Sequence, residues 1–146
     1  MKGYVLDASV AVKWFLLPSQ ETLTREALKL LRDLENGRVR LVVPDLFWSE
    51  IGNVFWKAVR ANRFPARAAA EAIQALRELN IPTVSCSELV SDAFLIALES
   101  SHAVCDCIYV ALAVASALPL LTADERLAQH LSPRFPVRWL GSFEAL

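Results

Sequence analysis

The sequence lacks an excess of basic residues, which is the usual mark of a protein that binds nucleic acid. Fifteen Lys and Arg residues are balanced by 16 Asp and Glu residues in a chain of 146, so the formal net charge is −1. Binding to nucleic acid normally relies on Lys and Arg side chains that displace counterions from phosphates. Two explanations stay open: either the protein binds no nucleic acid, or its basic residues are gathered locally and an acidic site offsets them in the total.

Segments that connect or repeat domains are missing too. The chain has no Gly/Ser-rich linker, no low-complexity stretch and no repeat of fixed period. Its 146 residues suit one domain of ordinary size, and 55% of them are hydrophobic, which is enough for a sizeable core. We therefore predict a single domain over residues 1–146.

Cysteine is scarce. The three cysteines, Cys86, Cys105 and Cys107, are an odd number, and Asp7 does not fit the apolar segment of a secretory signal. Both features favour free thiols in a reducing compartment, so we expect a cytoplasmic protein. A zinc site at His102, Cys105 and Cys107 is not favoured, because residues two apart on a helix point about 200° from each other and a fourth ligand is missing.

One apolar stretch, residues 103–121, approaches the length of a membrane span. Asp106 lies near one end of the stretch and Pro119 near the other. Because a carboxylate inside a bilayer is costly, a buried helix followed by a buried strand explains the stretch better. We expect no membrane association.

Short apolar runs alternate with helical patterns along the whole chain. The patterns predict strands at 4–6, 39–43, 81–84, 118–122 and 137–140, and helices at 9–17, 21–35, 46–61, 65–79, 88–99, 106–117 and 124–131. Asp45 and Ser87 are expected to cap the helices that follow them. Strands that are apolar on both faces are typical of a parallel sheet covered by helices. The predicted fold is therefore α/β, a three-layer α/β/α sandwich around a central, mainly parallel sheet.

Four acidic residues from distant parts of the chain fall at equivalent places in this pattern: Asp7, Glu50, Asp106 and Asp124. Asp7 ends the first predicted strand and Asp124 follows the fourth, whereas Glu50 and Asp106 lie in the first turns of helices. The carboxyl ends of parallel strands and the starts of the following helices share one edge of a sheet, where such folds bind ligands. We therefore expect the four carboxylates to meet in one cleft.

Asp7, Glu50 and Asp106 have apolar neighbours in the sequence, which strengthens this hypothesis. Burying several unpaired carboxylates together is costly unless protons or a cation neutralise them. Oxygen ligands alone suit Mg²⁺ or Mn²⁺, which activates water and stabilises the charge that develops on a phosphate. Taken one at a time, the acids have simpler explanations: a loop residue at Asp7, a solvated helix residue at Glu50 and a helix cap at Asp124.

The segments that carry these acids resemble four sequence blocks of the PIN-domain family, and particularly of its VapC toxin group. They appear in the family's order and together span nearly the whole chain: 5–14 (VLDASVAVKW), 44–53 (PDLFWSEIGN), 105–113 (CDCIYVALA) and 120–127 (LLTADERL).

The resemblance implies an α/β/α fold and cleavage of RNA that depends on Mg²⁺ or Mn²⁺, with the same four acids as the catalytic, metal-binding set. It also implies that Ser9 and Thr122 support the site through hydrogen bonds. Family members of this size are often toxins that dimerise and are blocked by a small antitoxin, which inserts a segment over the acidic cleft. We therefore expect an RNA substrate, a cognate antitoxin partner and a homodimer.

A cluster of basic residues permits two interpretations. The densest basic run of the chain consists of Lys57, Arg60 and Arg63, and Arg67 follows it. Lys57 and Arg60 are neighbours on a helix surface. The cluster either guides an RNA backbone toward Glu50 on the same helix or forms an ordinary solvated face.

Three tryptophans also have two explanations. Trp14, Trp48 and Trp56 either stack on the bases of a single strand or belong to the core or to a dimer interface. Trp48 and Trp56 are eight residues apart and so lie on nearly one helical face, which favours the core or interface.

Two other functions stay open beside the ribonuclease. A metal-dependent phosphatase would form a phospho-aspartate at Asp7, but that class resembles Asp-x-Asp at the first strand and the corresponding residue here is Ser9. A non-catalytic RNA- or protein-binding module on the same fold is the second alternative, although all four acids are present.

Overall fold

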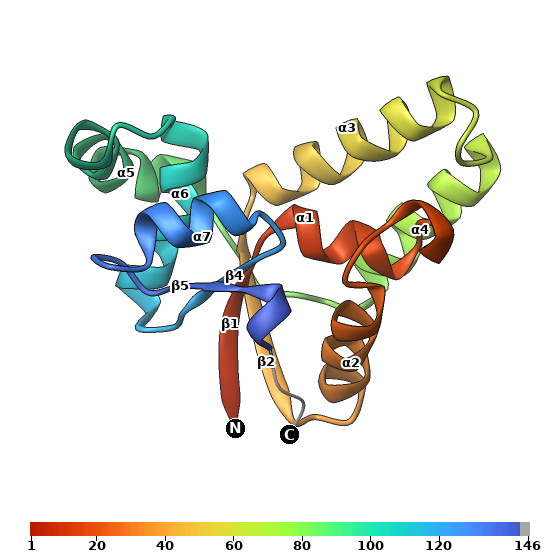
Figure 1. The fold of residues 1–146 in the computed structure, drawn as a ribbon, viewed down its shortest axis with the longest axis horizontal. Coiled ribbons are helices and arrows are strands. Elements are labelled where there is room, and N and C mark those ends of the chain that lie inside the picture. Colours follow the sequence, from red (N-terminus) through yellow and green to blue (C-terminus); the bar gives the residue numbers. More distant parts are fainter. Residues whose placement is uncertain (144–146) are drawn as a thin grey trace.

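A five-stranded sheet, in which every pairing is parallel, forms the centre of the structure (Figure 1). The structure is a computed structural model and describes residues 1–143. Across the sheet the order is β3-β2-β1-β4-β5, and the strands are β1 (Lys2–Leu6), β2 (Val39–Pro44), β3 (Thr83–Val84), β4 (Leu120–Thr122) and β5 (Val137–Trp139). The strand order changes direction between β1 and β4, and parallel sheets bind ligands beyond the carboxyl ends of their strands at such a point.

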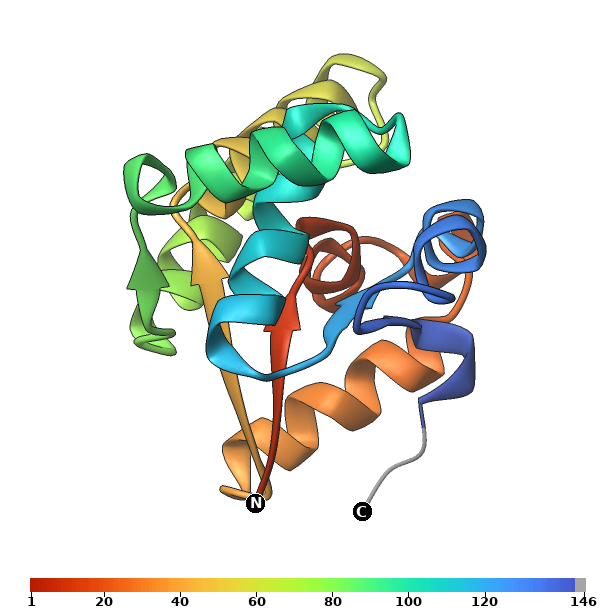
Figure 2. The ribbon, with the colours of Figure 1, turned by 90° about the vertical axis from the view of Figure 1, so that its left-hand side faces the viewer.

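Helices cover both faces of the sheet, so the predicted three-layer α/β/α fold is confirmed. Helix α6 packs against β1 and β2 on one face, whereas α2 packs against β2 on the other (Figure 1). The helices of the described residues are α1 (Ala8–Ala11), α2 (Thr24–Glu35), α3 (Leu46–Arg60), α4 (Ala66–Glu78), α5 (Cys86–Ser100), α6 (Val104–Ser116) and α7 (Glu125–Leu131). Figure 2 shows α3 and α5 above the carboxyl ends of the strands.

The predicted helix at 9–17 is wrong in its extent. Helix α1 ends at Ala11, and a 3₁₀ turn over Val12–Trp14 follows it. Two contacts outside the helix hold this turn: the indole Nε1 of Trp14 donates to the carbonyl oxygen of Ala27 at 2.7 Å, and Lys13 Nζ lies 3.0 Å from Glu21 Oε1. Tertiary contacts therefore override the helical pattern.

Two predicted helix caps are also corrected. Asp45 occupies the capping position of α3, but its backbone is helical and its carboxylate instead accepts a hydrogen bond from the Cys86 amide at 3.0 Å. Helix α5 is capped by Ser85 rather than Ser87, because Ser85 has the extended backbone that a cap requires and accepts from the Ser87 amide. The Asp45 bond joins the start of α3 to the start of α5.

Strand β3 is shorter than the predicted 81–84. Pro82 has no amide hydrogen and can only accept in the sheet; its carbonyl oxygen accepts from the Val43 amide at 3.0 Å. Regular pairing therefore begins only at Thr83.

One face of α3 determines how this helix sits on the core. Phe47, Ile51 and Phe55 recur every four residues and are at most 1% exposed. Burying this stripe fixes the rotation of α3 about its axis. The neighbouring Glu50 is thereby held only partly exposed, at the edge of the buried face.

The three tryptophans lie in different environments. Trp14 is buried in the core, and Trp48 packs edge-on against Phe47 with ring centroids 5.0 Å apart. Trp56, by contrast, is 53% exposed and carries the guanidinium of Arg60 over its ring at 5.0 Å. The core explanation therefore holds for Trp14, while Trp56 is a surface residue.

The apolar stretch at 103–121 forms a largely buried helix, α6, followed by the buried strand β4, as predicted. Among residues 1–143 no single helix is both long and apolar enough to cross a bilayer, although α5 and α6, bent by 113°, satisfy those criteria as a pair. All three cysteines are free thiols, as expected. Cys105 is exposed and Cys107 is buried, so the two side chains point to different sides of α6.

Candidate functional site

Asp7 lies at the point where the strand order changes direction. The pairing of Leu6 with Leu121 places Asp7 beside Thr122, at the carboxyl ends of two neighbouring strands. The Thr122 hydroxyl donates to Asp7 Oδ2 at 2.7 Å, and the Ser9 hydroxyl donates to the same oxygen at 3.0 Å. These two bonds orient the Asp7 carboxylate, so Ser9 and Thr122 make the kind of contact that the sequence predicts for them.

The same two hydroxyls tie Asp7 to the loop that follows β4. Ser9 Oγ accepts from the Ala123 amide at 3.1 Å, and Thr122 Oγ1 accepts from the Asp124 amide at 3.1 Å. Asp124 also caps α7, because its Oδ1 accepts from the Leu127 amide at 3.1 Å. The capping explanation of Asp124 is therefore correct, and it leaves the second carboxylate oxygen available to other partners.

Glu50 reaches the site from α3 and has one clear partner. The hydroxyl of Tyr109, on α6, donates to Glu50 Oε1 at 2.5 Å. Tyr109 is only 3% exposed, and burial together with the nearby Asp7 charge raises its pKa, so it stays a donor. Tyr109 is not among the site residues predicted from the sequence. It follows Asp106 by three residues and so lies on the same side of a helix, which is the sequence feature that could have placed it near the acids.

The charges of the acidic residues act on one another. Burial raises the pKa of Asp7, and the charge of Asp106 raises it further. The hydrogen bonds that Asp7 accepts from Thr122 and Ser9 lower its pKa, but they only partly offset the increase. The pKa of Glu50 is also raised, mainly by burial and then by the charges of Asp7 and Asp106. Burial raises the pKa of Asp106 too, with a further contribution from Asp124 and an opposing one from His102. The structure thus brings the four predicted acids into one electrostatic neighbourhood.

The donor set of this neighbourhood suits a hard divalent cation. The four carboxylates come from separate segments, and burial penalises the charged form of three of them, so a cation would relieve that penalty. As the side chains stand, however, no three His, Cys, Asp or Glu residues within 1–143 are close enough together to hold a metal ion.

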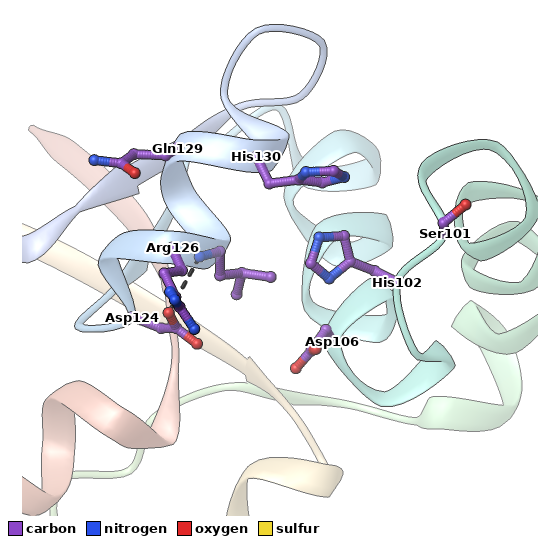
Figure 3. A pocket seen from close by; sticks show the side chains of 8 residues that line it. Ser101, His102, Asp106, Asp124, Arg126, Gln129 and His130 are labelled. Atoms are coloured by element: carbon purple, nitrogen blue, oxygen red, sulfur yellow. Dashed lines mark hydrogen bonds between the residues drawn. The ribbon is translucent and has the colours of Figure 1, made fainter.

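A cleft of about 640 Å³ opens beside these acids, between α7 and the corner that joins α5 to α6 (Figure 3). Asp106 and Asp124 lie on opposite sides of it. The predicted RNA-binding residues Lys57, Arg60 and Arg63 do not line this cleft. They are exposed at the far end of α3 and just beyond it, where both interpretations of them stay open.

Three solved structures are similar to this one. The crystal structure of PAE2754 from Pyrobaculum aerophilum has a TM-score of 0.68 and 21% identity, over 97% of this chain and 91% of that one. A toxin–antitoxin complex from Klebsiella pneumoniae has a TM-score of 0.61 and 16% identity, over 92% and 95% of the two chains. VapBC2 from Rickettsia felis, bound to a DNA fragment from their promoter, has a TM-score of 0.58 and 11% identity, over 94% and 98%. At these identities the likeness shows the fold.

No curated protein sequence is significantly similar to this chain. The PIN domain model matches residues 4–130, which contain all four acids and both supporting hydroxyls. The chain therefore belongs to the PIN domain family.

Proposed function

We propose that this protein is an endoribonuclease that requires Mg²⁺ or Mn²⁺ and is the toxin of a VapBC-type toxin–antitoxin pair. PIN domains are generally nucleases, and two of the similar structures are toxin–antitoxin proteins. The observation that carries the proposal is the convergence of Asp7, Glu50, Asp106 and Asp124 from four separate segments on one edge of the sheet. A purely structural role does not require three partly or fully buried carboxyl groups, those of Asp7, Glu50 and Asp106, whose pKa values are raised by burial and by neighbouring acidic charges.

Each residue has a defined part in this proposal. Asp7, Glu50, Asp106 and Asp124 would hold the cation, which would supply activation of water and stabilisation of charge on the scissile phosphate. Ser9 and Thr122 keep Asp7 Oδ2 in place, and Tyr109 holds Glu50 Oε1. Two of the four acids also cap helices: Asp7 accepts from the Ser9 amide at the start of α1, and Asp124 accepts from the Leu127 amide at the start of α7.

The phosphatase alternative gains no support. A phosphatase of that class would carry a second acid two residues after Asp7, whereas Ser9 stands there and its hydroxyl donates to Asp7 Oδ2. Membership of the PIN family also favours hydrolysis of nucleic acid. The non-catalytic binding module is the remaining rival, and a cleavage experiment separates it from the nuclease.

We also propose an antitoxin partner, a homodimer and a cytoplasmic location. Helix α5 presents apolar side chains to solvent, with Val90, Phe94 and Leu98 on one face and each at least 45% exposed. Exposed apolar patches of this kind mark protein–protein contacts. The free thiols fit the reducing cytoplasm.

The test of activity compares RNA with DNA of the same sequence. We expect purified protein to cut single-stranded RNA at internal positions with Mg²⁺ or Mn²⁺, to stop when EDTA removes the metal, and to leave the DNA intact. Cleavage that survives EDTA, or no cleavage of any RNA in a mixed-sequence pool, would contradict the proposal.

The phenol of Tyr109 provides a second prediction. Replacing it in Tyr109→Phe removes the donor to Glu50, so the Glu50 carboxylate loses its fixed position. We expect Mn²⁺ affinity to fall by about tenfold, which is typical for the loss of a group that orients a metal ligand. Isothermal titration with Mn²⁺ measures this directly.

Tyr4→Phe is the matched control for this change. Tyr4 is equally buried, at 3% exposed, and packs edge-on against Phe143 away from the acids. We expect it to bind Mn²⁺ like the parent. If Tyr109→Phe also keeps parental affinity, the hydrogen bond has no role in metal binding.

A further inference from the structure

The cleft beside the acids has two chemically different ends. At one end Asp106 and Asp124 face each other, and at the other the side chains of His102 and His130 project between α7 and the α5–α6 corner (Figure 3). Arg126 extends from α7 into the same cleft, beside Asp124 (Figure 3). A nucleic acid that reaches the acids along this cleft must pass these cationic and hydrogen-bonding groups.

Arg126 is a cation without a counterpart among the described residues. It is exposed, and it makes no salt bridge or hydrogen bond with any residue of 1–143, not even with the neighbouring Asp124. Arg134, on the chain that follows α7, is engaged with Glu99 at 3.2 Å. The guanidinium of Arg126 therefore has its five donors available, in the planar arrangement that suits a phosphate.

The two histidines are held so that they face the cleft. Nε2 of His130 lies 3.0 Å from the carbonyl oxygen of Ser100. Because a carbonyl oxygen only accepts, this nitrogen carries the hydrogen. The two imidazole rings pack edge to face with centroids 4.5 Å apart, which keeps His102 between His130 and Asp106 (Figure 3). Each ring therefore has a defined neighbour that sets its place beside the cleft.

Electrostatics explain why such groups are needed at this place. A single-stranded nucleic acid carries a negative charge at each phosphate, and the carboxylates of Asp106 and Asp124 repel those that no metal ion neutralises. A cation next to the acids offsets this repulsion for the neighbouring phosphate. The chain as a whole cannot do so, because its net charge is −1.

We propose that Arg126, flanked by His102 and His130, binds the phosphate adjacent to the one that is cleaved, and so determines the path of the RNA strand through the cleft. The inference rests on the proposed nuclease function and adds a substrate-binding site to it. It places the strand between α7 and the α5–α6 corner rather than along the far end of α3.

Fluorescence anisotropy of a labelled RNA oligonucleotide in EDTA tests the inference without cleavage. We expect Arg126→Gln to weaken binding by about tenfold at low salt and to reduce the slope of log affinity against log salt by about one, as the loss of one phosphate contact should. Arg77→Gln, which removes an exposed arginine from α4, should bind like the parent. Equal affinity of Arg126→Gln and Arg77→Gln would overturn the inference.

A series of oligonucleotides with one uncharged methylphosphonate linkage each identifies the phosphate. One position should lower the affinity of the parent and leave that of Arg126→Gln unchanged, because the variant has already lost that contact. If every position affects both proteins equally, Arg126 binds no particular phosphate and the inference fails. A parent that neither binds nor cuts RNA contradicts the nuclease function itself, so the two failures are distinguishable.

Discussion

Replacing Asp7 by Asn is expected to abolish detectable RNA cleavage, with a loss of roughly 100-fold or more. A carboxylate that holds a catalytic metal contributes several kcal/mol to the stability of the transition state, and about 3 kcal/mol corresponds to that factor. The Asp7 side chain caps α1 by accepting from the Ser9 amide, and Asn, which has the same size and caps a helix as well as Asp does, should preserve α1. The change therefore removes the charge and leaves the fold.

The measurement is the initial rate of cleavage of a labelled RNA at saturating Mn²⁺. Asp92→Asn is the matched control, since Asp92 is an exposed acid on α5 that takes no part in the acidic cluster. It should cut at the parental rate. If Asp7→Asn cuts as fast as Asp92→Asn, the four-carboxylate site is not the catalytic site and the binding-module alternative gains ground.

The second large effect is a dependence of stability on metal and pH. The pKa values of Asp7, Glu50 and Asp106 are raised in the folded protein by burial and by one another's charges. For a carboxyl group with a raised folded pKa, the stabilising contribution is complete below the unfolded pKa, about 4, and is lost as the pH rises through the folded pKa. The metal-free protein should therefore lose this contribution as the pH rises above about 4.

A divalent cation should reverse the loss. At about 100 times its dissociation constant, a ligand that binds only the folded state stabilises it by about 2.7 kcal/mol, which raises the Tm of a domain of this size by roughly 5–10 °C. Thermal unfolding at pH 5 and pH 7.5, with and without Mn²⁺, measures both effects. The pKa of Asp45 is lowered by the hydrogen bonds from Cys86. Its contribution to stability is therefore present above its unfolded pKa and is lost as the pH falls, which is opposite to the three acids above.

Comparison with Asp7→Asn isolates the acidic cluster from other titrating groups. Without metal, the variant should gain stability relative to the parent at pH 7.5 and lose that advantage at low pH. With Mn²⁺ it should show a much smaller rise in Tm. An equal response of parent and variant to both pH and Mn²⁺ would mean that Asp7 is not part of a metal site.

The position of Asp7 beside Thr122 could be predicted from the sequence because it depends on sheet geometry alone. Asp7 and Thr122 each follow an apolar run, and parallel strands place their carboxyl ends on one edge. The alternation of strands and helices likewise predicts the layers. Neither of these two predictions requires knowledge of individual side-chain contacts.

The contacts that complete the site depend on tertiary geometry instead. Tyr109 and Glu50 are 59 positions apart, and they meet only because a buried stripe of α3 sets the rotation of that helix against α6. A hydrophobic pattern shows which face is buried, but it does not show which polar atoms then face each other. The same limit applies to Asp45, whose carboxylate bonds to Cys86 across 41 positions rather than to its own helix.

The most direct test of the central claim is a crystal structure with Mn²⁺, recorded at a wavelength where manganese scatters anomalously. The account predicts an anomalous peak enclosed by the carboxylates of Asp7, Glu50, Asp106 and Asp124, with oxygen ligands and space for water on the side of the cleft. A peak elsewhere on the molecule, or no peak at the four carboxylates at saturating Mn²⁺, would contradict the account.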